Sequence, residues 1–542
     1  MSETDFEEGG NEHGGTVPID ADEPVIRLGR GSVLLILVAV FIIAACGIIY
    51  ELLIGSISSY FIGNSVKQYS LTIGFFLFAM GIGSWLSRMI RKKLLQRFVA
   101  LEIWLGFFGG MTVPFLYVAY TYTSIYQYFM LIQVVILGTL IGLEIPLLTR
   151  LLRAEGTLRV LLSNILAMDY LGALAAALLF PFLLFPMLGS MHTSLLTGAV
   201  NVAVGIVMLR LVSKYLKQDD LAMLMIQIGF VCAALFLMAS KSEHLLERWE
   251  DSIYQGQIVH NEESQYQKIV LTRWHGETWL YLNEHLQFSS LDEHRYHEAL
   301  VHPAMSLAKN HERVLVIGGG DGLGVREILK YPSVKQVDLV DIDPAMTRLG
   351  TRNIFLTDLN NNSLSRQQVK VTNEDAFIYL QKPHQKYGVI IIDLPDPREE
   401  GLGKLYSVEI YRLCRRHLGP GGVMVSQSTS PFFTRKAYWC IGASIREAGF
   451  RVHSYNAYVP SFGLWGFHMG VPVADESSGR SVTEVAFDPA ELVLKVKTRY
   501  LYKELFQQMF QFDGDTNKIE VDPNTLDRPK LAGYYRSGYD NW

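Results

Sequence analysis

The chain has 542 residues, a net charge of −5 at neutral pH and four cysteines, and its charged residues are unevenly distributed. Residues 32–240 carry 19 charged side chains in 209 positions, whereas residues 241–542 carry 72 in 302. This contrast excludes a single globular domain, a secreted disulfide scaffold and a disordered chain. The negative charge and the absence of a long basic stripe argue against nucleic acid as a partner. The cysteines lack metal-ligand spacing, so we expect no metal site.

The amino-terminal part divides into an acidic leader and an apolar region. Residues 1–31 hold eight acidic side chains and two arginines, without the basic start of a signal peptide, which predicts a disordered tail. Within 32–240, apolar runs are long enough, or nearly so, to cross about 30 Å of hydrocarbon as helices. The seven runs are 32–54, 70–90, 98–120, 125–149, 160–188, 190–212 and 219–240. We therefore expect a multi-pass membrane domain in contact with lipid.

Basic residues gather in alternate loops of this region. They are Arg88, Arg91, Lys92, Lys93 and Arg97, then Arg150, Arg153 and Arg159, then Arg210, Lys214 and Lys217. By the positive-inside rule these loops and the amino terminus lie in the cytoplasm. Seven full crossings would then place the carboxyl-terminal part outside the cytoplasm. Either one run does not cross fully, or that part is extracytoplasmic.

Four carboxylates fall within or at the ends of the apolar runs, and no lysine or arginine lies in mid-run to pair with them. They are Glu51, Glu102, Glu144 and Asp169. One interpretation is a path for protons or organic cations through the helices. The other is that the glutamates lie near lipid headgroups and that Asp169 hydrogen-bonds a neighbouring helix.

Strands and helices alternate in the carboxyl-terminal part. Short β-like stretches at 268–272 and 278–282 predict a small β-sheet subdomain over 250–300. Further apolar strands at 313–317, 337–340, 388–392 and 422–426 predict a doubly wound, mostly parallel, Rossmann-like domain over 301–475. Residues 476–542 contain a helix-like, aromatic stretch at 500–512, and we interpret them as a helical cover packed on the core. A lid over a substrate site is the alternative.

A glycine-rich turn follows the first strand of this domain. The strand at 313–317 runs into Gly318, Gly319, Gly320, Asp321 and Gly322, before a predicted helix over 325–330. The second strand ends at Asp341, which can accept hydrogen bonds from ribose hydroxyls. This order of features predicts a nucleoside site. The charge of Asp321 disfavours the pyrophosphate of NAD or FAD and favours a cationic adenosyl sulfonium. Alternatively, Asp321 only caps the helix.

A second pair of acids ends a later strand. Asp393 and Asp396 are three residues apart and are held by Pro395 and Pro397. Two such acids beside a sulfonium pocket can hold a diamine, and one can take the proton released when nitrogen attacks carbon. In the alternative interpretation, Asp396 caps the next helix.

These residues resemble the spermidine synthases, which are polyamine aminopropyltransferases, over about residues 260–470. The matching stretches are Tyr266-Gln267, residues 287–298, the glycine turn with Arg326-Glu327, Asp341, Glu374-Asp375, Asp393 to Pro397, and Leu405 to Ser407. A subset of that family similarly carries a multi-pass amino-terminal region. The resemblance implies a domain of the S-adenosylmethionine-dependent transferase type. It also implies transfer of an aminopropyl group from decarboxylated S-adenosylmethionine to putrescine, giving spermidine and methylthioadenosine.

The resemblance also implies roles for individual residues. Asp393 is expected to be the catalytic proton acceptor. The nucleoside part of the donor is expected to contact Gln267, Gly318, Gly320, Asp341, Asp375 and Ala376, with Asp375 near the adenine. Asp321 is expected to bind the ammonium of the aminopropyl group, and Tyr296, His297 and Asp396 to line the acceptor site. No permanently bound cofactor is expected, only the decarboxylated co-substrate.

Location and partners follow from the same resemblance. We expect a multi-pass protein of the cell (inner) membrane whose catalytic domain lies in the cytoplasm, where the donor is made. Its expected partners are putrescine or a similar diamine and membrane lipid, with a homodimer left open.

The chain departs from the family pattern at Phe462, where many soluble relatives place an acceptor-binding tyrosine. Two other functions stay open. A methyltransferase that uses intact S-adenosylmethionine can share the fold, although Asp321 would repel its extra carboxylate. The second alternative function is that of a polyamine transporter or sensor, which binds polyamines without catalysing a reaction.

Overall fold

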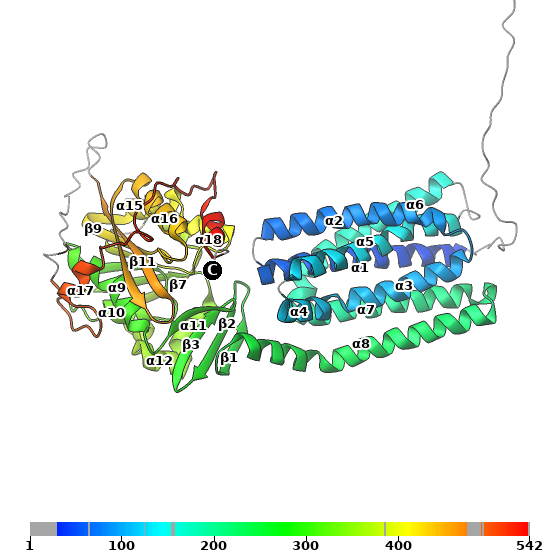
Figure 1. Cartoon of the computed structure of the whole chain (residues 1–542), viewed down its shortest axis with the longest axis horizontal. Coiled ribbons are helices and arrows are strands. Elements are labelled where there is room, and N and C mark those ends of the chain that lie inside the picture. Colours follow the sequence, from blue (N-terminus) through cyan, green and yellow to red (C-terminus); the bar gives the residue numbers. More distant parts are fainter. Residues whose placement is uncertain are drawn as a thin grey trace, which may run out of the picture. The chain divides into compact units, whose positions relative to one another are not determined.

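The computed structural model describes residues 30–539 except 63–64, 124, 153–157, 384–385, 474–488 and 490–492. The predicted acidic tail, up to residue 29, lies outside the described residues. The chain forms two compact units, residues 1–246 and 247–542, and each is described by itself. Figure 1 shows the first unit as a bundle of long helices and the second as sheets covered by shorter helices.

The first unit consists of helices that coincide with the apolar runs of the sequence. They are α1 (Arg30–Ile62), α2 (Ser65–Leu86), α3 (Leu94–Gly110), α4 (Thr112–Tyr122), α5 (Tyr126–Leu151), α6 (Leu158–Leu179), α7 (Phe185–Val212) and α8 (Gln218–Ile253), which continues into the second unit. Five helical stretches are long and apolar enough to cross a membrane, or six if α3 and α4, bent by 41°, form one span. One stretch, Arg159–Tyr215, is interrupted by Gly189, whose φ of 67° is not helical.

Small residues allow these helices to approach each other closely. A Cβ atom on Gly142 of α5 would lie 2.1 Å from the carbonyl oxygen of Met80 on α2. A Cβ atom on Gly198 of α7 would lie 2.5 Å from the carbonyl oxygen of Gly106 on α3. Close approach through small residues is typical of helices that pack within lipid.

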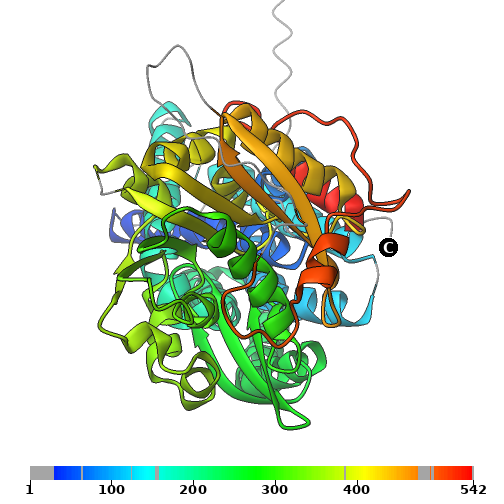
Figure 2. The same cartoon turned by 90° about the vertical axis from the view of Figure 1, so that its left-hand side faces the viewer.

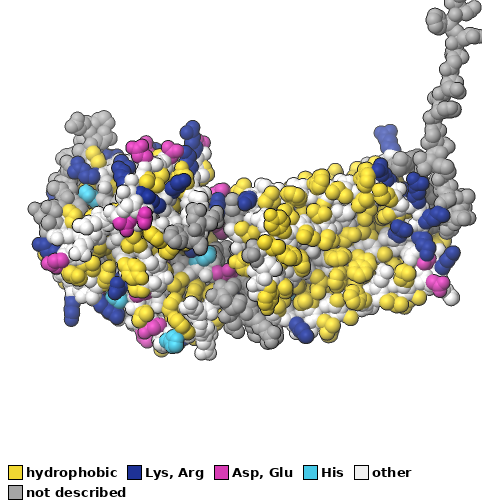
Figure 3. Space-filling model, in the orientation of Figure 1, with side chains coloured by type: hydrophobic (Ala, Val, Ile, Leu, Met, Phe, Trp, Pro, Cys, Tyr) yellow, Lys and Arg dark blue, Asp and Glu magenta, His cyan; other side chains and the backbone are white. Residues whose placement is uncertain are grey.

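Three basic loops meet at one end of this bundle. The guanidinium of Arg150, at the end of α5, donates to the carbonyl oxygens of Ile90 (2.9 Å) and Ser87 (2.6 Å), just after α2. Lys93, before α3, pairs with Asp220 at the start of α8 at 2.7 Å. Figure 3 shows Lys and Arg side chains gathered towards the right-hand end of the bundle, whereas its visible sides are mostly hydrophobic.

The opposite end of the bundle is marked by aromatic contacts. Phe61, at the end of α1, stacks on Tyr120, at the end of α4, with ring centroids 4.2 Å apart. The bent pair α3–α4 therefore runs from the basic end to the aromatic end. Because α8 starts at the basic end, it leads the chain away from the basic loops.

The second unit begins with a small antiparallel sheet, as predicted. Its strands are β1 (Gln257–Glu263), β2 (Lys268–Trp274), β3 (Glu277–Leu282) and β4 (His285–Ser289), in the order β1-β2-β3-β4.

A seven-stranded sheet follows, in the order β10-β11-β9-β8-β5-β6-β7. Its strands are β5 (Arg313–Gly318), β6 (Gln336–Asp341), β7 (Val369–Asn373), β8 (Tyr387–Asp393), β9 (Leu418–Gln427), β10 (Phe450–Val459) and β11 (Gly463–Pro472). β5 to β9 are parallel, which confirms the Rossmann-like prediction. β11 and β10 add an antiparallel hairpin, so the sheet is mixed.

Both faces of this sheet are buried. Val314 and Val316 of β5 belong to one hydrophobic cluster, whereas Leu315 and Ile317 belong to another on the opposite face. The helices of this part are α9 (Glu293–Leu307), α10 (Leu323–Ile328), α11 (Pro344–Arg352), α12 (Ile354–Asn360), α13 (Ala376–Gln381), α14 (Glu400–Gly403), α15 (Val408–His417) and α16 (Arg435–Glu447).

The carboxyl-terminal stretch is less helical than its sequence suggests. It contains α17 (Lys503–Gln508), which is shorter than the helix-like stretch at 500–512, and α18 (Leu531–Tyr539). Phe506 of α17 is fully buried against the core. Figures 1 and 2 show α18 (red) beside α16, with which it is in contact.

Candidate active site

The glycine turn lies directly against Asp393. Gly318 and Gly319 have φ angles of 79° and 66°, which glycine adopts without strain. A Cβ atom on Gly318 would lie 2.0 Å from the carbonyl oxygen of Asp393, and one on Gly319 would lie 3.2 Å from its carboxylate. Glycine is therefore required here so that the ends of β5 and β8 can meet.

Asp341 fixes the next part of the same turn. Its carboxylate accepts hydrogen bonds from the backbone N–H of Gly320 (3.1 Å) and of Asp343 (2.8 Å). Burial raises the pKa of Asp341 to about 6. The side-chain amide of Gln267 donates to Asp343 at 3.0 Å, which places Gln267 next to the segment that follows Asp341. These groups surround the position that a ribose takes in doubly wound folds.

Asp375 and Ala376 lie after β7, at the same edge of the sheet. Asp375 caps α13 by accepting the backbone N–H of Phe377 at 2.7 Å. Its other oxygen pairs with Lys404 at 2.7 Å, and although burial alone would raise its pKa, Lys404 holds that pKa below the usual value. Ala376, the first residue of α13, is buried.

Asp321 is part of the glycine turn. One of its oxygens accepts the backbone N–H of Leu323, the first residue of α10, at 2.8 Å, although the N-cap position itself is occupied by Gly322. Burial raises the pKa of Asp321 to about 6, and the charge of Asp393 adds to this, while His297 opposes it. The carboxylate therefore bonds to the start of α10 and is also part of an acidic group around the turn.

Asp393 is paired with Tyr296 across the site. The hydroxyl of Tyr296, on α9, donates to Asp393 at 2.7 Å. Burial raises the pKa of Asp393, whereas His297 and the Tyr296 hydroxyl lower it, and the net shift is upward. An ordinary aspartate is a weak base, so an upward shift of its pKa makes Asp393 a better proton acceptor.

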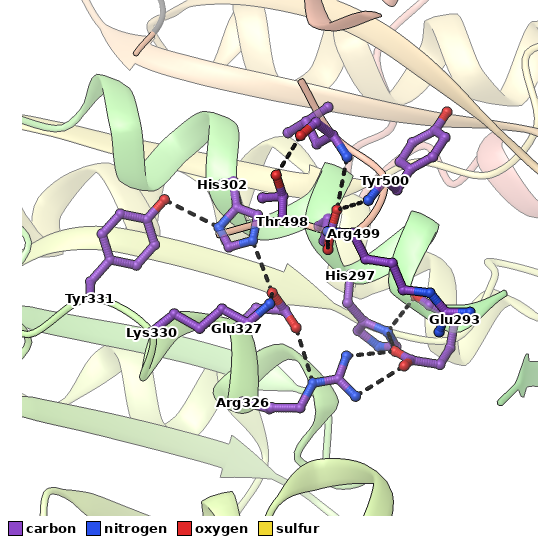
Figure 4. Close-up of polar contacts among 12 residues, drawn as sticks. Glu293, His297, His302, Arg326, Glu327, Lys330, Tyr331, Thr498, Arg499 and Tyr500 are labelled. Atoms are coloured by element: carbon purple, nitrogen blue, oxygen red, sulfur yellow. Dashed lines mark hydrogen bonds and ion pairs between the residues drawn. The ribbon is translucent and has the colours of Figure 1, made fainter. Parts of the chain in front are cut away.

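His297 is held by an ion pair on its own helix. Its Nδ1 lies 2.8 Å from the carboxylate of Glu293, and both oxygens of that carboxylate accept from Arg326 at 3.0 and 2.9 Å. Burial alone would lower the pKa of His297, but Glu293 raises it to about 9. Figure 4 shows Arg326 lying between Glu293 and Glu327. His297 is therefore a fixed, charged neighbour of the acids.

One carboxylate oxygen of Asp396 accepts hydrogen bonds from two hydroxyl groups. Its Oδ2 accepts from Tyr535 of α18 at 2.7 Å and from Thr429 at 3.4 Å. Its Oδ1 is buried and has no hydrogen-bond partner among the residues that the structure describes. These bonds to Tyr535 and Thr429 differ from the capping role considered for Asp396.

The loop between the two acids is held by hydrogen bonds to its backbone. Tyr406 donates to the carbonyl oxygens of Leu394 (3.1 Å) and Pro395 (3.0 Å), and the side chain of Gln427 donates to Leu394 at 2.6 Å. Thr429, with a φ of 60°, is held in a left-handed conformation that is rare for a β-branched residue. The acids are thus mounted on a constrained segment.

Phe462 lies in the turn between β10 and β11, close to the acceptor side of the site. Its ring centroid is 6.4 Å from that of Tyr296 and 5.1 Å from that of Trp465. The turn is tied to α9, because Asp292 accepts the backbone N–H (2.7 Å) and hydroxyl (2.6 Å) of Ser461.

A nearby cluster has side chains of metal-ligand type. Ligand atoms of Glu298, His302 and Glu327, all buried, lie within 4.8 Å of one another. They are already engaged: Glu298 accepts the backbone N–H groups of residues 499–501 at 2.6, 2.8 and 2.9 Å. Glu327 contacts His302 at 2.9 Å and pairs with Lys330 at 2.5 Å (Figure 4). This cluster fastens the carboxyl-terminal stretch to α9.

The structure brings together the residues expected to form the site and adds others. Six functional residues had no role from sequence reasoning: Glu293, Arg326, Tyr406, Gln427, Thr429 and Tyr535. Arg326 and Tyr406 lie in stretches that resemble the family, which was the available signal. Tyr535 had none, because it lies beyond every recognised motif.

Comparison with known proteins gives consistent results. A family model described as "Spermine/spermidine synthase domain" matches residues 293–477. The "Polyamine aminopropyltransferase 1" of Ralstonia nicotianae is 42% identical over 97% of this chain and 99% of that protein. The "Polyamine aminopropyltransferase" of Leptospira interrogans is 40% identical over 92% and 97%.

The similarity extends to a further relative and to a solved structure. The "Polyamine aminopropyltransferase 1" of Streptomyces coelicolor is 39% identical over 95% of each chain. A crystal structure of "Spermidine Synthase in Complex with Transition State Analogue AdoDATO" is 23% identical, with a TM-score of 0.43, over 47% of this chain and 86% of that one.

Proposed function

We propose that this chain, which belongs to the polyamine aminopropyltransferase family, transfers the aminopropyl group of decarboxylated S-adenosylmethionine to putrescine. The products are spermidine and methylthioadenosine. The observation that carries the proposal is the placement of Asp393 against a glycine turn that contains a second acid, Asp321, with a third acid, Asp396, three residues further along the chain.

The donor would lie along the ends of β5, β6 and β7. Asp341 would bind the ribose hydroxyls, and Asp375, with Ala376, would border the adenine. Asp321 would meet the ammonium of the aminopropyl group, because an anion beside a cationic donor is favourable. Lys404, now paired with Asp375, would keep that carboxylate fixed.

The acceptor would lie between Asp393 and Asp396. A neutral amine nitrogen attacks the methylene carbon bonded to the sulfonium, the carbon–nitrogen bond forms, and the carbon–sulfur bond breaks. The electron pair stays on sulfur, so methylthioadenosine leaves as a neutral molecule. The nitrogen then loses a proton to Asp393, whose raised pKa suits a general base. Tyr296 orients Asp393 through its 2.7 Å hydrogen bond.

The two other functions are not favoured. A methyltransferase must accommodate a carboxylate on its donor, and Asp321 with Asp393 would repel it. A transporter or sensor that catalyses no reaction would not need the Asp393 carboxylate that Tyr296 holds by a hydrogen bond. The relatives with high identity over nearly the whole chain are polyamine aminopropyltransferases.

Incubation of the purified full chain with each donor and a panel of amines tests the proposal. We expect spermidine and methylthioadenosine in equal amounts from putrescine and the decarboxylated donor. A methylated amine formed from intact S-adenosylmethionine would overturn it, as would the absence of any alkylated amine.

We also propose that the first unit lies in a membrane. Its support is the set of five or six long apolar stretches, the hydrophobic sides of the bundle in Figure 3, and the basic residues at one end. Its side chains that face outward are large and apolar, such as Leu77, Phe78, Phe182 and Phe236.

A further inference from the structure

Tyr535, on the carboxyl-terminal helix α18, reaches the acceptor side of the site. Its hydroxyl donates to Asp396 Oδ2 at 2.7 Å, and the residue is only 3% exposed. The two residues are 139 positions apart in the sequence. We propose that Tyr535 is an acceptor-site residue that helps to bind the distal ammonium of the diamine; this rests on the function proposed above. It would supply the hydroxyl that Phe462 lacks.

The start of α18 is fixed to the core by Asn524. The Asn524 side chain accepts the backbone N–H of Lys530 at 3.0 Å and donates to the carbonyl oxygen of Gly403 at 2.8 Å. Its backbone N–H donates to Ser444 of α16 at 2.8 Å. Leu531, the first residue of α18, is fully buried.

The end of α18 is fixed as well. A Cβ atom on Gly538 would lie 2.6 Å from the carbonyl oxygen of Phe433, so only glycine fits there. The ring of Tyr539 stacks on Phe433 with centroids 5.8 Å apart. Arg536 donates to the carbonyl oxygen of Arg398 at 3.2 Å. With both ends fastened, Tyr535 is held in place rather than carried on a loose tail.

The hydrogen bonds of Asp396 leave one oxygen for a ligand. Tyr535 and Thr429 both donate to Oδ2, whereas the buried Oδ1 accepts no hydrogen bond of normal geometry from the described residues, with the Gln427 side chain as its polar neighbour. A buried carboxylate oxygen without a donor is unfavourable, and an ammonium group offers three. The ammonium can bond to Oδ1 of Asp396 and to the phenolic oxygen of Tyr535, whose own hydrogen points to Oδ2.

Phe462 lies near Tyr296, with ring centroids 6.4 Å apart in an edge-type contact, and has no hydroxyl to offer. The guanidinium of Arg398 lies over the ring of Tyr535 at 5.5 Å, which further fixes the ring plane. The acceptor site is therefore completed from the carboxyl-terminal stretch, and that stretch both covers the core and enters the site.

Tyr535→Phe tests the proposal because it removes one hydroxyl and keeps the ring. Tyr534→Phe is the matched control on the same helix, since Tyr534 packs against a hydrophobic cluster of the core. Binding of putrescine to the full chain is measured by calorimetry with methylthioadenosine present, together with steady-state turnover and thermal unfolding. We expect Tyr535→Phe to raise the Kd and KM of putrescine about tenfold, with the KM of the donor and the melting temperature unchanged.

Wild-type affinity for putrescine in Tyr535→Phe would overturn the proposal. Equal loss of donor and diamine affinity with a lower melting temperature would also overturn it, because it would indicate a structural role. Failure of the proposed function is distinguishable: the wild-type protein would then form no spermidine, while the binding comparison would still decide the role of Tyr535.

Discussion

For single residues, the proposed role of the Asp321 carboxylate is to distinguish between the decarboxylated and the intact sulfonium donor. Asp321→Ala removes its charge and its bond to Leu323, whereas Asp321→Asn removes the charge and can keep that bond. We expect both variants to weaken binding of the decarboxylated donor by about 10–100-fold, the effect of about 1.5–3 kcal/mol from one charge-assisted contact. Binding of intact S-adenosylmethionine should change less. Calorimetry with both donors measures this.

The pH dependence of the same binding is the second readout for Asp321. Its pKa is raised to about 6, so the carboxylate is charged above that pH and neutral below it. Affinity for the decarboxylated donor should therefore fall as the pH drops through about 6, and this loss should be smaller in Asp321→Asn. Equal weakening of both donors at every pH would refute selection by charge.

Substitution of Phe462 tests how the enzyme selects the chain length of its diamine acceptor. Its ring lies near Tyr296 and offers no hydroxyl, so we expect turnover of diamines with a weak preference for four carbons over three or five. Phe462→Tyr should sharpen that preference by up to about tenfold, the effect of one hydrogen bond. The measurement is kcat/KM for the three diamines in both proteins. A strictly selective wild-type enzyme, unaffected by the change, would show that Phe462 does not line the site.

At the scale of elements, Glu298 of α9 clamps the carboxyl-terminal stretch. Its carboxylate accepts three backbone N–H groups from residues 499–501, and glutamine would turn an amide N–H towards at least one of them. We expect Glu298→Gln to destabilise the unit by about 2–4 kcal/mol. Glu312→Gln is the control, because Glu312 is half-exposed and paired only with Lys335 at the surface. Chemical unfolding followed by tryptophan fluorescence measures both; equal stabilities would show that the clamp is dispensable.

The sequence predicts most strands of the large sheet but not the direction in which all of them pair. Strands such as β5 and β8 were predicted because continuous apolar runs indicate strands buried on both faces. The antiparallel β10–β11 hairpin was not, since strand direction depends on pairing partners that a single sequence does not show. Tyr296 and Asp393 were both expected in the site, yet their contact spans 97 positions and follows only from the fold. The contact of Tyr535 with Asp396 has no local signal at all.

For the whole molecule, the arrangement of the helices in the first unit predicts which parts of the chain face the same side of a membrane. The basic loops lie at the end where α8 begins, and α8 leads the chain away from them. If the unit spans a membrane, residues near Lys214 and residues of the second unit should face opposite sides. With cytoplasmic basic loops, this arrangement would correspond to the extracytoplasmic alternative for the second unit and would conflict with the expectation of a cytoplasmic catalytic domain.

Single cysteines at two exposed positions, Lys214→Cys and Asp358→Cys, test this in a background without the four native cysteines. We expect a membrane-impermeant thiol reagent to label one of them in intact cells and the other only after permeabilisation. Labelling of both from the same side would mean that one apolar run does not cross.

The proposed role of Asp393 as proton acceptor can be tested in the chemical step of a single turnover. Asparagine has nearly the same shape as aspartate and can accept the hydrogen bond from Tyr296, but it cannot take a proton. The rate is measured by rapid quenching with the donor bound and putrescine saturating, in the wild-type protein and in Asp393→Asn. We predict a rate lower by about 10²-fold or more with the donor affinity largely retained. A rate in Asp393→Asn close to that of the wild-type protein would contradict the account.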